Sequence, residues 1–301
     1  MALYRVTINI CSPIATSLKG DTIWGHIIWG IANHEGDLAV QDFLKKENQT
    51  PQLVVSDAFP SGYICKPLPK PNNRLSNFSA DDYAKFKQQK KIKFIPASHY
   101  LSTPSPDNLS YEGTGFMHFE ASHNRIDRIS GTVLDDALFT TDELWPLGVN
   151  KKIGDALFDI YVESTLSSTR IKELFIWAFE NGYGADSSTG KGKIEIVAQP
   201  SQVNTKYKSA SYMALGPFVC DNEKILSSLR ADTFTRSGKI GGSFISDNMC
   251  PFKKTVILFD AGAVFESTEK LSFIGQIISN IHSDNRICQS GFTPVIPIIE
   301  E

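Results

Sequence analysis

The stretch 167–198, SSTRIKELFIWAFENGYGADSSTGKGKIEIVA, decides which fold the chain adopts. Its first half repeats apolar residues at helical spacing, namely Ile171, Leu174, Phe175, Ala178 and Phe179. Ser167 or Ser168 stands where a helix N-cap belongs, and Gly182 stands where a helix ends. A glycine-rich loop follows at 182–192, and 193–198 reads as a strand. The stretch therefore predicts a helix, a glycine loop and a strand, in that order.

The segments before this stretch complete a pattern of strands and helices. The expected strands lie at 3–10, 52–56, 115–121 and 156–163, and the expected helices at 22–32 and 37–45. Asp21 is the predicted N-cap of the first helix. Together with the helix at 168–180, this is the βαββαβ order of a ferredoxin-like (RRM-like) unit. We therefore predict an α+β fold with an N-terminal ferredoxin-like domain at 1–199.

The remainder, 200–301, is predicted to be a C-terminal α+β domain. It contains strand candidates at 212–215 and 256–259 and a helix candidate at 273–281. We interpret it as a second, smaller or degenerate ferredoxin-like unit.

An insertion at about 66–112 interrupts the N-terminal unit. Within it, 66–93 holds eight lysines and arginines against two acids, and 102–114 is rich in turn residues. We expect this insertion to project from the core. It is a solvated lysine-rich loop, a thumb that contacts RNA, or a docking element for a neighbouring subunit, and the sequence leaves these open.

Composition narrows the class of protein. The chain has 301 residues, 41% of them hydrophobic, and a net charge of −3, which excludes a uniformly basic nucleic-acid coat but not a local basic groove. It contains no apolar run of membrane-spanning length, and its first residues form a strand pattern and not a signal peptide. The five cysteines are far apart and lack zinc spacing. We expect a reduced, cytoplasmic protein without a structural metal or cofactor.

The glycine-rich loop does not match a nucleotide-binding P-loop. Five residues separate Gly184 from Gly190, and Gly192 stands where a P-loop has the serine or threonine that ligates magnesium. The loop also follows a helix and precedes a strand, which reverses the order that points a helix N-terminus at phosphate. Nucleotide hydrolysis is therefore not expected.

The same loop has the chemistry to hold a sugar-phosphate backbone. Gly190 and Gly192 lack a Cβ, so a ligand can approach closely and successive N–H groups can face phosphate oxygens. Hydroxyl and ammonium donors surround them, namely Ser187, Ser188, Thr189, Lys191 and Lys193. The alternative is a long turn in which the glycines are needed only for the backbone conformation and bind no ligand.

Several short motifs, in their order and spacing, resemble a known family. They are Pro13, DTIWGH at 21–26 with Trp29, SDAFP at 56–60, HNRIDR at 123–128 with Gly131-Thr132 and Leu138-Phe139, STGKG at 188–192, PFKKT at 251–255, GAVF at 262–265, His282, QSG at 289–291 and Pro294. This set resembles the RAMP superfamily of CRISPR effector proteins. More narrowly, it is similar to the Cas-five-group subunit of the type III-A (Csm) complex, its subunit four.

The resemblance implies a role within a ribonucleoprotein complex that acts in antiviral defence. Such subunits bind the repeat-derived 5′ tag of the CRISPR RNA (crRNA) and cap one end of the backbone filament. They join that filament to the large polymerase-like signature subunit, and they do not cut RNA. The implied partners are therefore crRNA, the large signature subunit and a neighbouring RAMP backbone subunit.

Two further groups of residues could contact RNA. Arg125 and Arg128 are spaced to bind phosphate, and His123 and Asn124 add a stacking ring and polar donors beside them. The alternative for these arginines is pairing with nearby acids, namely Asp127, Asp135 and Asp136. In the C-terminal part, Arg236 and Lys239 lie in a basic stretch between Phe234 and Phe244. Basic residues near aromatic ones suit single-stranded RNA, although an ordinary surface loop would look similar.

His26 is the residue on which a catalytic alternative depends. A histidine beside tryptophans on a helix is most simply a core residue, but related RAMP processing enzymes use a histidine near this region. A metal-independent endoribonuclease that matures crRNA would need a second proton-transfer group, which His123 or Tyr183 could supply. We expect a non-catalytic protein. The residues expected to contact RNA are Lys19, His26, His123, Asn124, Arg125, Arg128, Ser188, Thr189, Gly190, Lys191, Gly192, Lys193, Arg236 and Lys239.

Overall fold

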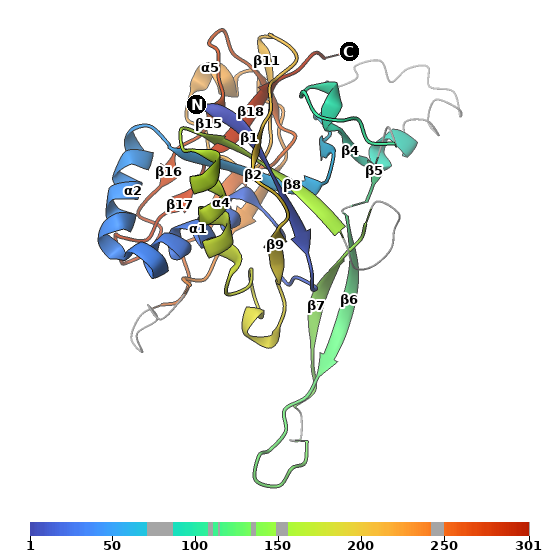
Figure 1. The fold of residues 1–301 in the computed structure, drawn as a ribbon, viewed down its shortest axis with the longest axis vertical. Coiled ribbons are helices and arrows are strands. Elements are labelled where there is room, and N and C mark those ends of the chain that lie inside the picture. Colours follow the sequence, from blue (N-terminus) through green and yellow to red (C-terminus); the bar gives the residue numbers. More distant parts are fainter. Residues whose placement is uncertain are drawn as a thin grey trace.

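The computed structural model describes residues 1–70, 87–107, 111–113, 115–133, 137–148, 156–241 and 250–300. This part of the chain is a mixed α/β protein with several antiparallel sheets (Figure 1). Within these ranges, no helix is both long and apolar enough to cross a membrane.

The largest sheet is built around β1 (Ala2–Ile10). On one side β1 pairs along its whole length with β8 (Ala156–Ser164), which in turn pairs with β2 (Leu53–Pro60). On its other side β1 pairs with β9 (Ile194–Ile196) near its end and with β10 (Ser201–Gln202) near its start. All these pairs are antiparallel, so the sheet is ordered β9/β10, β1, β8, β2. The strands expected from alternation are confirmed.

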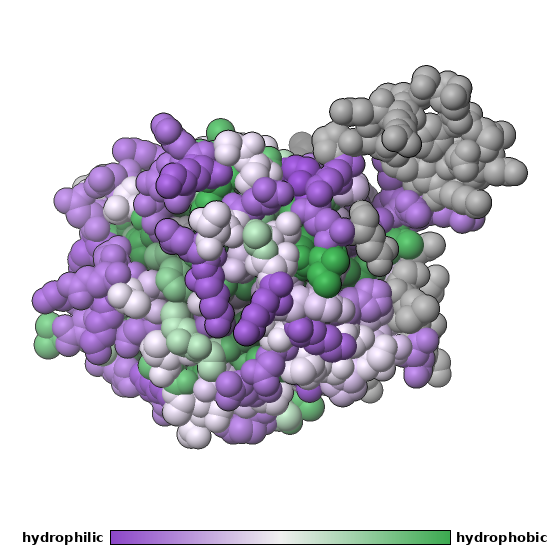
Figure 2. Space-filling view, turned by 90° about the horizontal axis from the view of Figure 1, so that it is seen from above, coloured by the Kyte–Doolittle hydropathy of each residue, from purple (hydrophilic) through white to green (hydrophobic). Residues whose placement is uncertain are grey.

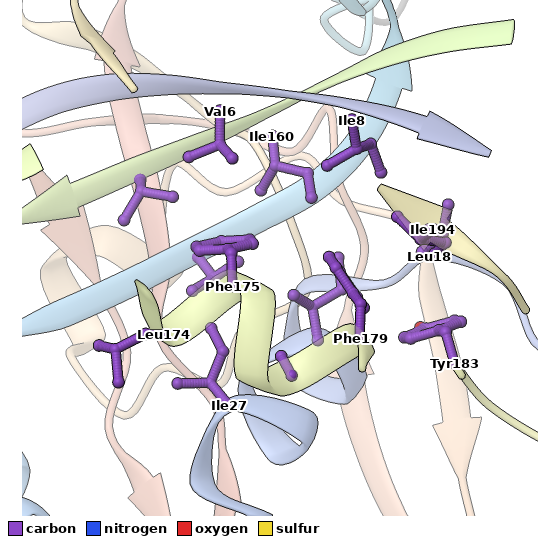
Figure 3. Close-up of a cluster of buried hydrophobic side chains, with 14 of the residues drawn as sticks. Val6, Ile8, Leu18, Ile27, Ile160, Leu174, Phe175, Phe179, Tyr183 and Ile194 are labelled. Carbon is purple, nitrogen blue, oxygen red and sulfur yellow. The ribbon is translucent and has the colours of Figure 1, made fainter. Parts of the chain in front are cut away.

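Two helices cover one face of this sheet. Helix α1 (Gly20–Glu35) follows β1 in the chain and precedes β2. Helix α4 (Ser168–Phe179) connects β8 to β9. Figure 3 shows their side chains meeting those of the strands in one buried layer, with Phe175 and Phe179 of α4 facing Val6 and Ile160 of the sheet. The helix predicted at 168–180 is confirmed, including its cap, because the Ser167 Oγ accepts the Arg170 N–H at 3.2 Å.

The start of α1 differs from the prediction. Lys19, not Asp21, is the N-cap residue, and its side chain makes no capping bond. Asp21 lies in the first turn, where its carboxylate accepts hydrogen bonds from Arg236 at 2.9 and 3.0 Å and from Gln289 at 3.0 Å. A tertiary ion pair has displaced the local cap. Helix α2 (Asp37–Gln49), predicted at 37–45, continues one turn further.

The C-terminal part packs on the other face of the main sheet. Its four-stranded sheet is ordered β14 (Val264–Glu266), β11 (Ser211–Ala214), β18 (Thr293–Pro297), β15 (Phe273–Ile274). Leu3, Phe59 and Tyr161 share a buried cluster with Met213 and Ile296. Hydrophobic residues on both sides of position 200 therefore form a common core. The domain boundary at 199/200 stays a prediction.

The helix predicted at 273–281 is wrong. This segment forms two short strands, β15 and β16 (Ile277–Ile278), which pair with β18 and with β17 (Gln289–Ser290). Gly275 between them has a φ of +115°, and a Cβ there would lie 1.9 Å from the Gly291 carbonyl oxygen. Tertiary strand pairing has therefore overridden the apolar spacing that suggested a helix.

The insertion at 66–112 contains more regular structure than expected. The three-stranded sheet β3 (Tyr63–Cys65), β4 (Ile92–Pro96) and β5 (Tyr111–Glu112) forms its base, with the 3₁₀ turn η2 (Ala97–His99) after β4. Much of the lysine-rich run at 66–93 lies outside the described residues.

The chain also forms two hairpins and short helical turns. In the C-terminal part, β12 (Thr233–Arg236) pairs with β13 (Val256–Phe259), and α5 (Glu223–Leu226) is a single turn. Arg236, for which an ordinary surface loop was the alternative interpretation, ends strand β12. The hairpin β6 (Phe116–His123) and β7 (Phe139–Pro146) projects far from the sheets (Figure 1). We call residues 116–146 the arm.

The arm is attached firmly at its base. The Phe116 ring stacks on Phe158 of β8 with centroids 5.0 Å apart, and Leu144 exchanges two backbone hydrogen bonds with Ile14 at 2.8 and 3.0 Å. These contacts join the arm to the main core, so it leaves the body in a defined direction.

Glu47 should make the stability of the fold depend on pH. It is fully buried in the last turn of α2, and its Oε1 accepts the N–H groups of Gln52 at 2.6 Å and Leu53 at 3.2 Å, while Oε2 has no partner among the described residues. Burial raises the pKa of Glu47 from 4.5 to about 7. Because the folded state then binds the proton more tightly, the free energy of unfolding should fall by about 3 kcal/mol as pH rises from about 4.5 to beyond 7.

Urea unfolding at pH 4.5 and pH 8 measures this effect. Glu47→Gln should be about 2–3 kcal/mol more stable than the wild type at pH 8 and differ little from it at pH 4.5. Glu223→Gln, an exposed position on α5, serves as the control and should follow the wild type. Parallel pH profiles for Glu47→Gln and the wild type would contradict the prediction.

Candidate nucleic-acid interface

The glycine loop between α4 and β9 uses most of its glycines to pack against its own chain. Gly182, Gly184, Gly190 and Gly192 all have positive φ. A Cβ on Gly192 would lie 2.1 Å from the Tyr183 carbonyl oxygen, and one on Gly184 would lie 2.6 Å from Thr16. Around Gly190, in contrast, nothing lies within 4 Å of that position. Gly190 alone among these four therefore leaves the backbone open to a ligand.

The loop does not form the expected cradle of outward N–H groups. The N–H of Thr189 donates to Asp186, that of Gly190 to Ser187, and that of Gly192 to Pro13, at 2.8 to 3.1 Å. The turn η3 (Ser187–Thr189) accounts for the first two bonds. The residues of this loop that are exposed to solvent are 185, 186 and 188–190, and Lys193, which follows it, is exposed as well.

Lys191 is held inside the protein. Its Nζ donates to the Thr141 Oγ1 at 3.0 Å and lies 3.3 Å from the Glu143 carboxylate and 3.4 Å from that of Asp186. Its side chain is buried, whereas Lys193 is exposed and pairs at 3.1 Å with Glu195. Lys191 therefore locks the glycine loop to the arm, and its charge is already balanced by two carboxylates.

His123 shares a partner with Lys191. Its Nε2 lies 3.0 Å from the same Thr141 Oγ1, and its ring stacks on Phe139 with centroids 5.4 Å apart. Two candidates far apart in sequence are thus brought together through Thr141 on β7. Strand β7 was not anticipated, because Asp142 and Glu143 interrupt its apolar pattern.

Asn124, Arg125 and Arg128 lie beyond His123, towards the exposed end of the arm. Neither arginine has an ion-pair partner among the described residues. Asp127 instead accepts the Ile129 N–H at 2.9 Å and the Ser130 hydroxyl at 3.0 Å. The other two acids considered as their partners, Asp135 and Asp136, lie outside the described residues.

His26 has the environment of a structural histidine. Its Nε2 accepts the Gly184 N–H at 3.2 Å, the ring also hydrogen bonds to the Ala178 backbone, and burial lowers its pKa. The neighbouring Tyr183 donates its hydroxyl to the Ser17 carbonyl at 2.8 Å, and burial raises its pKa well above the usual value. The ring centroids lie 4.8 Å apart. Both side chains therefore hold the glycine loop against α1.

Lys19 and Arg236 belong to an ionic junction at the start of α1. Lys19 Nζ lies 2.8 Å from Asp57 and 2.5 Å from Asp260. Burial opposes the charge of Lys19, but the two carboxylates outweigh it and raise its pKa. Arg236 binds Asp21 through Nε and one terminal nitrogen, and its guanidinium also lies 5.2 Å from the Phe234 ring.

Lys239 is the most accessible of the C-terminal candidates. Its side chain is exposed, with Nζ 5.3 Å from the Phe252 ring centroid. No group of three His, Cys, Asp or Glu side chains within the described ranges could hold a metal ion. The candidate interface thus consists of exposed groups of the glycine loop, the arm beside it, and Lys239 on a separate element.

Comparison with known proteins finds solved structures that have a similar fold. No protein-family model and no curated protein matches the sequence. A chain in the crystal structure of a Csm1–Csm4 cassette with pppApA matches with a TM-score of 0.54 at 12% identity, covering 99% of both chains. The Csm4 chain of a Csm3–Csm4 subcomplex from a type III-A CRISPR–Cas interference complex matches equally well, at 12% identity over 99% of this chain and 100% of the other.

This chain has a Csm4-like fold. A third structure, the Csm1–Csm4 cassette with cA4, gives a TM-score of 0.54 at 13% identity. The resemblance inferred from the motifs is thereby confirmed as a likeness of fold. The roles of individual residues within this Csm4-like fold stay predictions.

Alanine at Gly192 should be far more damaging than alanine at Gly190. Both positions have positive φ, so each substitution strains the backbone, but only Gly192 also places the new methyl group against the Tyr183 backbone. We expect Gly192→Ala to lower the free energy of unfolding by about 3 kcal/mol or more, and Gly190→Ala by about 1 kcal/mol. Urea unfolding of the two variants checks this, and equal losses would contradict it.

Arg236 should matter for stability even without RNA. Arg236→Ala leaves the Asp21 carboxylate, which is only 3% exposed, without its cation. The expected loss in unfolding free energy is about 3 kcal/mol. Lys193→Ala, whose ion pair is exposed on both sides, should cost less than about 0.5 kcal/mol and is the matched control. Thermal unfolding of both variants without RNA measures the difference. An Arg236→Ala variant as stable as the wild type would contradict a structural role for the Arg236–Asp21 pair.

Proposed function

We propose that this chain is the non-catalytic crRNA-binding subunit of a type III-A CRISPR effector complex, where it recognises the 5′ tag. The observation that carries this proposal is the match in fold to Csm4 over nearly the full length of both chains. The βαββαβ connection of β1, α1, β2, β8, α4 and β9 further supports the ferredoxin-like RAMP unit. Such a complex would act in the cytoplasm.

The RNA backbone would lie along the exposed side of the glycine loop. Gly190 leaves room for close approach, and the hydroxyls of Ser188 and Thr189 and the ammonium of Lys193 offer donors beside it. His123 stands next to the loop through Thr141, where its ring could stack on an unpaired base. Lys191 contributes by fixing the loop, since its own charge is occupied.

The partner proteins follow from the same match. The matched structures are described as complexes of Csm4 with Csm1 and with Csm3. We infer that this chain joins a large signature subunit to a RAMP backbone subunit, as those names imply for Csm4. The net charge of the chain is −3, so its acidic surface could pair with positively charged surfaces on these neighbours.

The ribonuclease alternative has less support. General acid–base cleavage needs two groups able to exchange protons near neutral pH. The ring nitrogens of His26 serve internal hydrogen bonds, and Tyr183 is buried with a strongly raised pKa. Incubation with repeat RNA in EDTA should yield no defined product. A product that disappears in His26→Ala would establish the alternative.

The central test is binding of RNA that carries the repeat-derived 5′ tag, against the same RNA with a scrambled 5′ end. We expect the purified chain to bind the tagged RNA more tightly. Lys193→Ala should weaken binding and reduce the slope of log K against log salt by about 1, because one phosphate contact is lost. Lys224→Ala, an exposed lysine on α5, should leave both quantities unchanged.

Equal affinity for the two RNAs would contradict tag recognition. An unchanged salt slope in Lys193→Ala would show that the glycine loop does not contact the RNA. Copurification with the partner proteins would then test the assignment as an effector subunit.

A further inference from the structure

Two segments far apart in the sequence contain lysines and no acidic residue. Residues 87–106 include four lysines and residues 201–210 include two, so together they carry a charge of +6 in a chain whose total is −3. Lys93, Lys206 and Lys208 are exposed, and none of the three has an ion-pair partner among the described residues. Positive charge is therefore concentrated here without carboxylates to balance it.

Hydrogen bonds join these two segments into one surface. The Lys206 N–H donates to the Tyr100 carbonyl, and the Ser102 N–H donates to the Asn204 carbonyl, both at 2.8 Å. The Asn204 N–H in turn donates to the Ser102 hydroxyl at 2.9 Å. The ammonium of Lys206 donates to the Ser98 carbonyl. The end of the first segment and the middle of the second are thus held side by side.

Three aromatic side chains are in contact on this surface. The Tyr100 ring contacts those of His99 and Tyr207, with centroids 6.4 and 6.2 Å apart and interplanar angles of 84° and 74°. His99 is exposed, and Tyr207 is 37% exposed. An edge-to-face contact covers at most one face of a ring, so the two outer rings keep area on which a planar group can stack. We call Lys93, His99, Tyr207 and Lys208 the lysine–aromatic surface.

The lysine–aromatic surface and the glycine loop lie in different parts of the molecule. The Tyr100 hydroxyl donates to the Ile299 carbonyl at 3.4 Å, which places this surface beside the C-terminus, at the top of Figure 1. The glycine loop lies instead beside the arm, to which Lys191 joins it through Thr141. Seen from the end that carries the C-terminus, the molecule is covered mostly by hydrophilic residues, with apolar ones interspersed (Figure 2).

The combination of exposed lysines and exposed rings fits one class of ligand. Lysine is depleted at protein interfaces, because burying its ammonium group is costly. Single-stranded nucleic acid offers phosphates to the lysines and unpaired bases to the rings, and this pairing of contacts does not depend on sequence. In a duplex the bases are stacked on one another, so the rings of His99 and Tyr207 would have no base face to contact.

We propose that the lysine–aromatic surface binds single-stranded nucleic acid without sequence preference, at a site separate from the one proposed for the crRNA tag. Bases stack on His99 and Tyr207, and Lys93 and Lys208 neutralise neighbouring phosphates. RNA and DNA strands share this chemistry. The inference goes beyond the proposed function because it requires no tag, and it gives the insertion at 66–112 a contact with nucleic acid at its base.

The test measures binding of the full-length chain to a labelled oligouridine of about 12 nucleotides, which carries no tag. Lys93→Ala/Lys208→Ala should weaken binding at least fivefold. It should also reduce the slope of log K against log salt by about 1.4, because two phosphate contacts on a single strand are lost. Lys45→Ala/Lys46→Ala, which removes two exposed lysines of α2, is the matched control and should change neither quantity. Circular dichroism and thermal unfolding verify that each variant is folded.

Variants of Tyr207 separate stacking from charge. Tyr207→Ala should weaken binding at least fivefold with an unchanged salt slope, because a stacking contact is lost and no phosphate contact is. Tyr207→Phe keeps the ring and should stay within twofold of the wild type. Equal losses in the two variants would overturn stacking as the basis of binding.

Other nucleic acids define the ligand. Oligothymidine of the same length shows whether the surface accepts DNA as well as RNA, and tighter binding of one names it as the ligand. Duplex RNA of the same length should bind more weakly. A duplex that binds as tightly as oligouridine would overturn the proposal, since its bases cannot stack on the rings.

The remaining outcomes separate this proposal from the proposed function. If the wild type does not bind oligouridine, or if Lys93→Ala/Lys208→Ala binds it like the wild type, the proposal fails. It also fails if that variant loses only its protein partners. Lys193→Ala should leave oligouridine affinity within twofold, and a loss equal to that of Lys93→Ala/Lys208→Ala would rule out a separate site. Absence of tag preference in the wild type would overturn the proposed function alone.

Discussion

The bulge in β2 at Ser56–Asp57 is the constraint on which the rest of the structure depends. The register of β2 against β8 shifts between Val55 and Ala58, which frees the backbone of the intervening residues for other partners. The Asp57 N–H donates to Leu215 of the C-terminal part at 3.0 Å, and its carboxylate accepts the Gly20 N–H at the start of α1 at 2.9 Å. One interruption in one strand therefore ties together the main sheet, the first helix and the second sheet.

The charges at this bulge explain why the two parts of the chain are held in one arrangement. Burial raises the pKa of Asp57 to about 6, and the nearby Asp260 carboxylate adds to the rise, although Lys19 lies beside Asp57 and opposes it. A second pair, Asp21 with Arg236, joins the first turn of α1 to strand β12 of the C-terminal part. Breaking a buried pair leaves an uncompensated charge, so these contacts penalise any other docking of the C-terminal part.

Local patterns in the sequence were enough to predict β1, α4 and β9, which position the glycine loop, but not β7 or the partners of the side chains at the site. The Ser167 cap, the apolar stripe of α4 and the alternation of β1 are short-range signals, and each is confirmed. The helix expected at 273–281 failed because Gly275 and the pairing with β18 are matters of tertiary contact. Lys191 looked like a free phosphate ligand because its carboxylate partner Glu143 is 48 residues away in sequence.

These partners change how an acidic chain can bind RNA. Of the cations expected to face phosphate, Lys19, Lys191 and Arg236 each lie beside a carboxylate that is at most 13% exposed. The carboxylates balance the charges of these three cations, so the cations add little to the electrostatic potential of the surface. Lys193, Lys239, Arg125 and Arg128 keep exposed charge, and the last two lie on an arm that is itself strongly acidic. A tight RNA site built from these residues alone would thus rest on few phosphate contacts. Under the proposed function, neutralising cations from neighbouring subunits would then be needed, and assembly would be a condition for strong RNA retention and not a consequence of it.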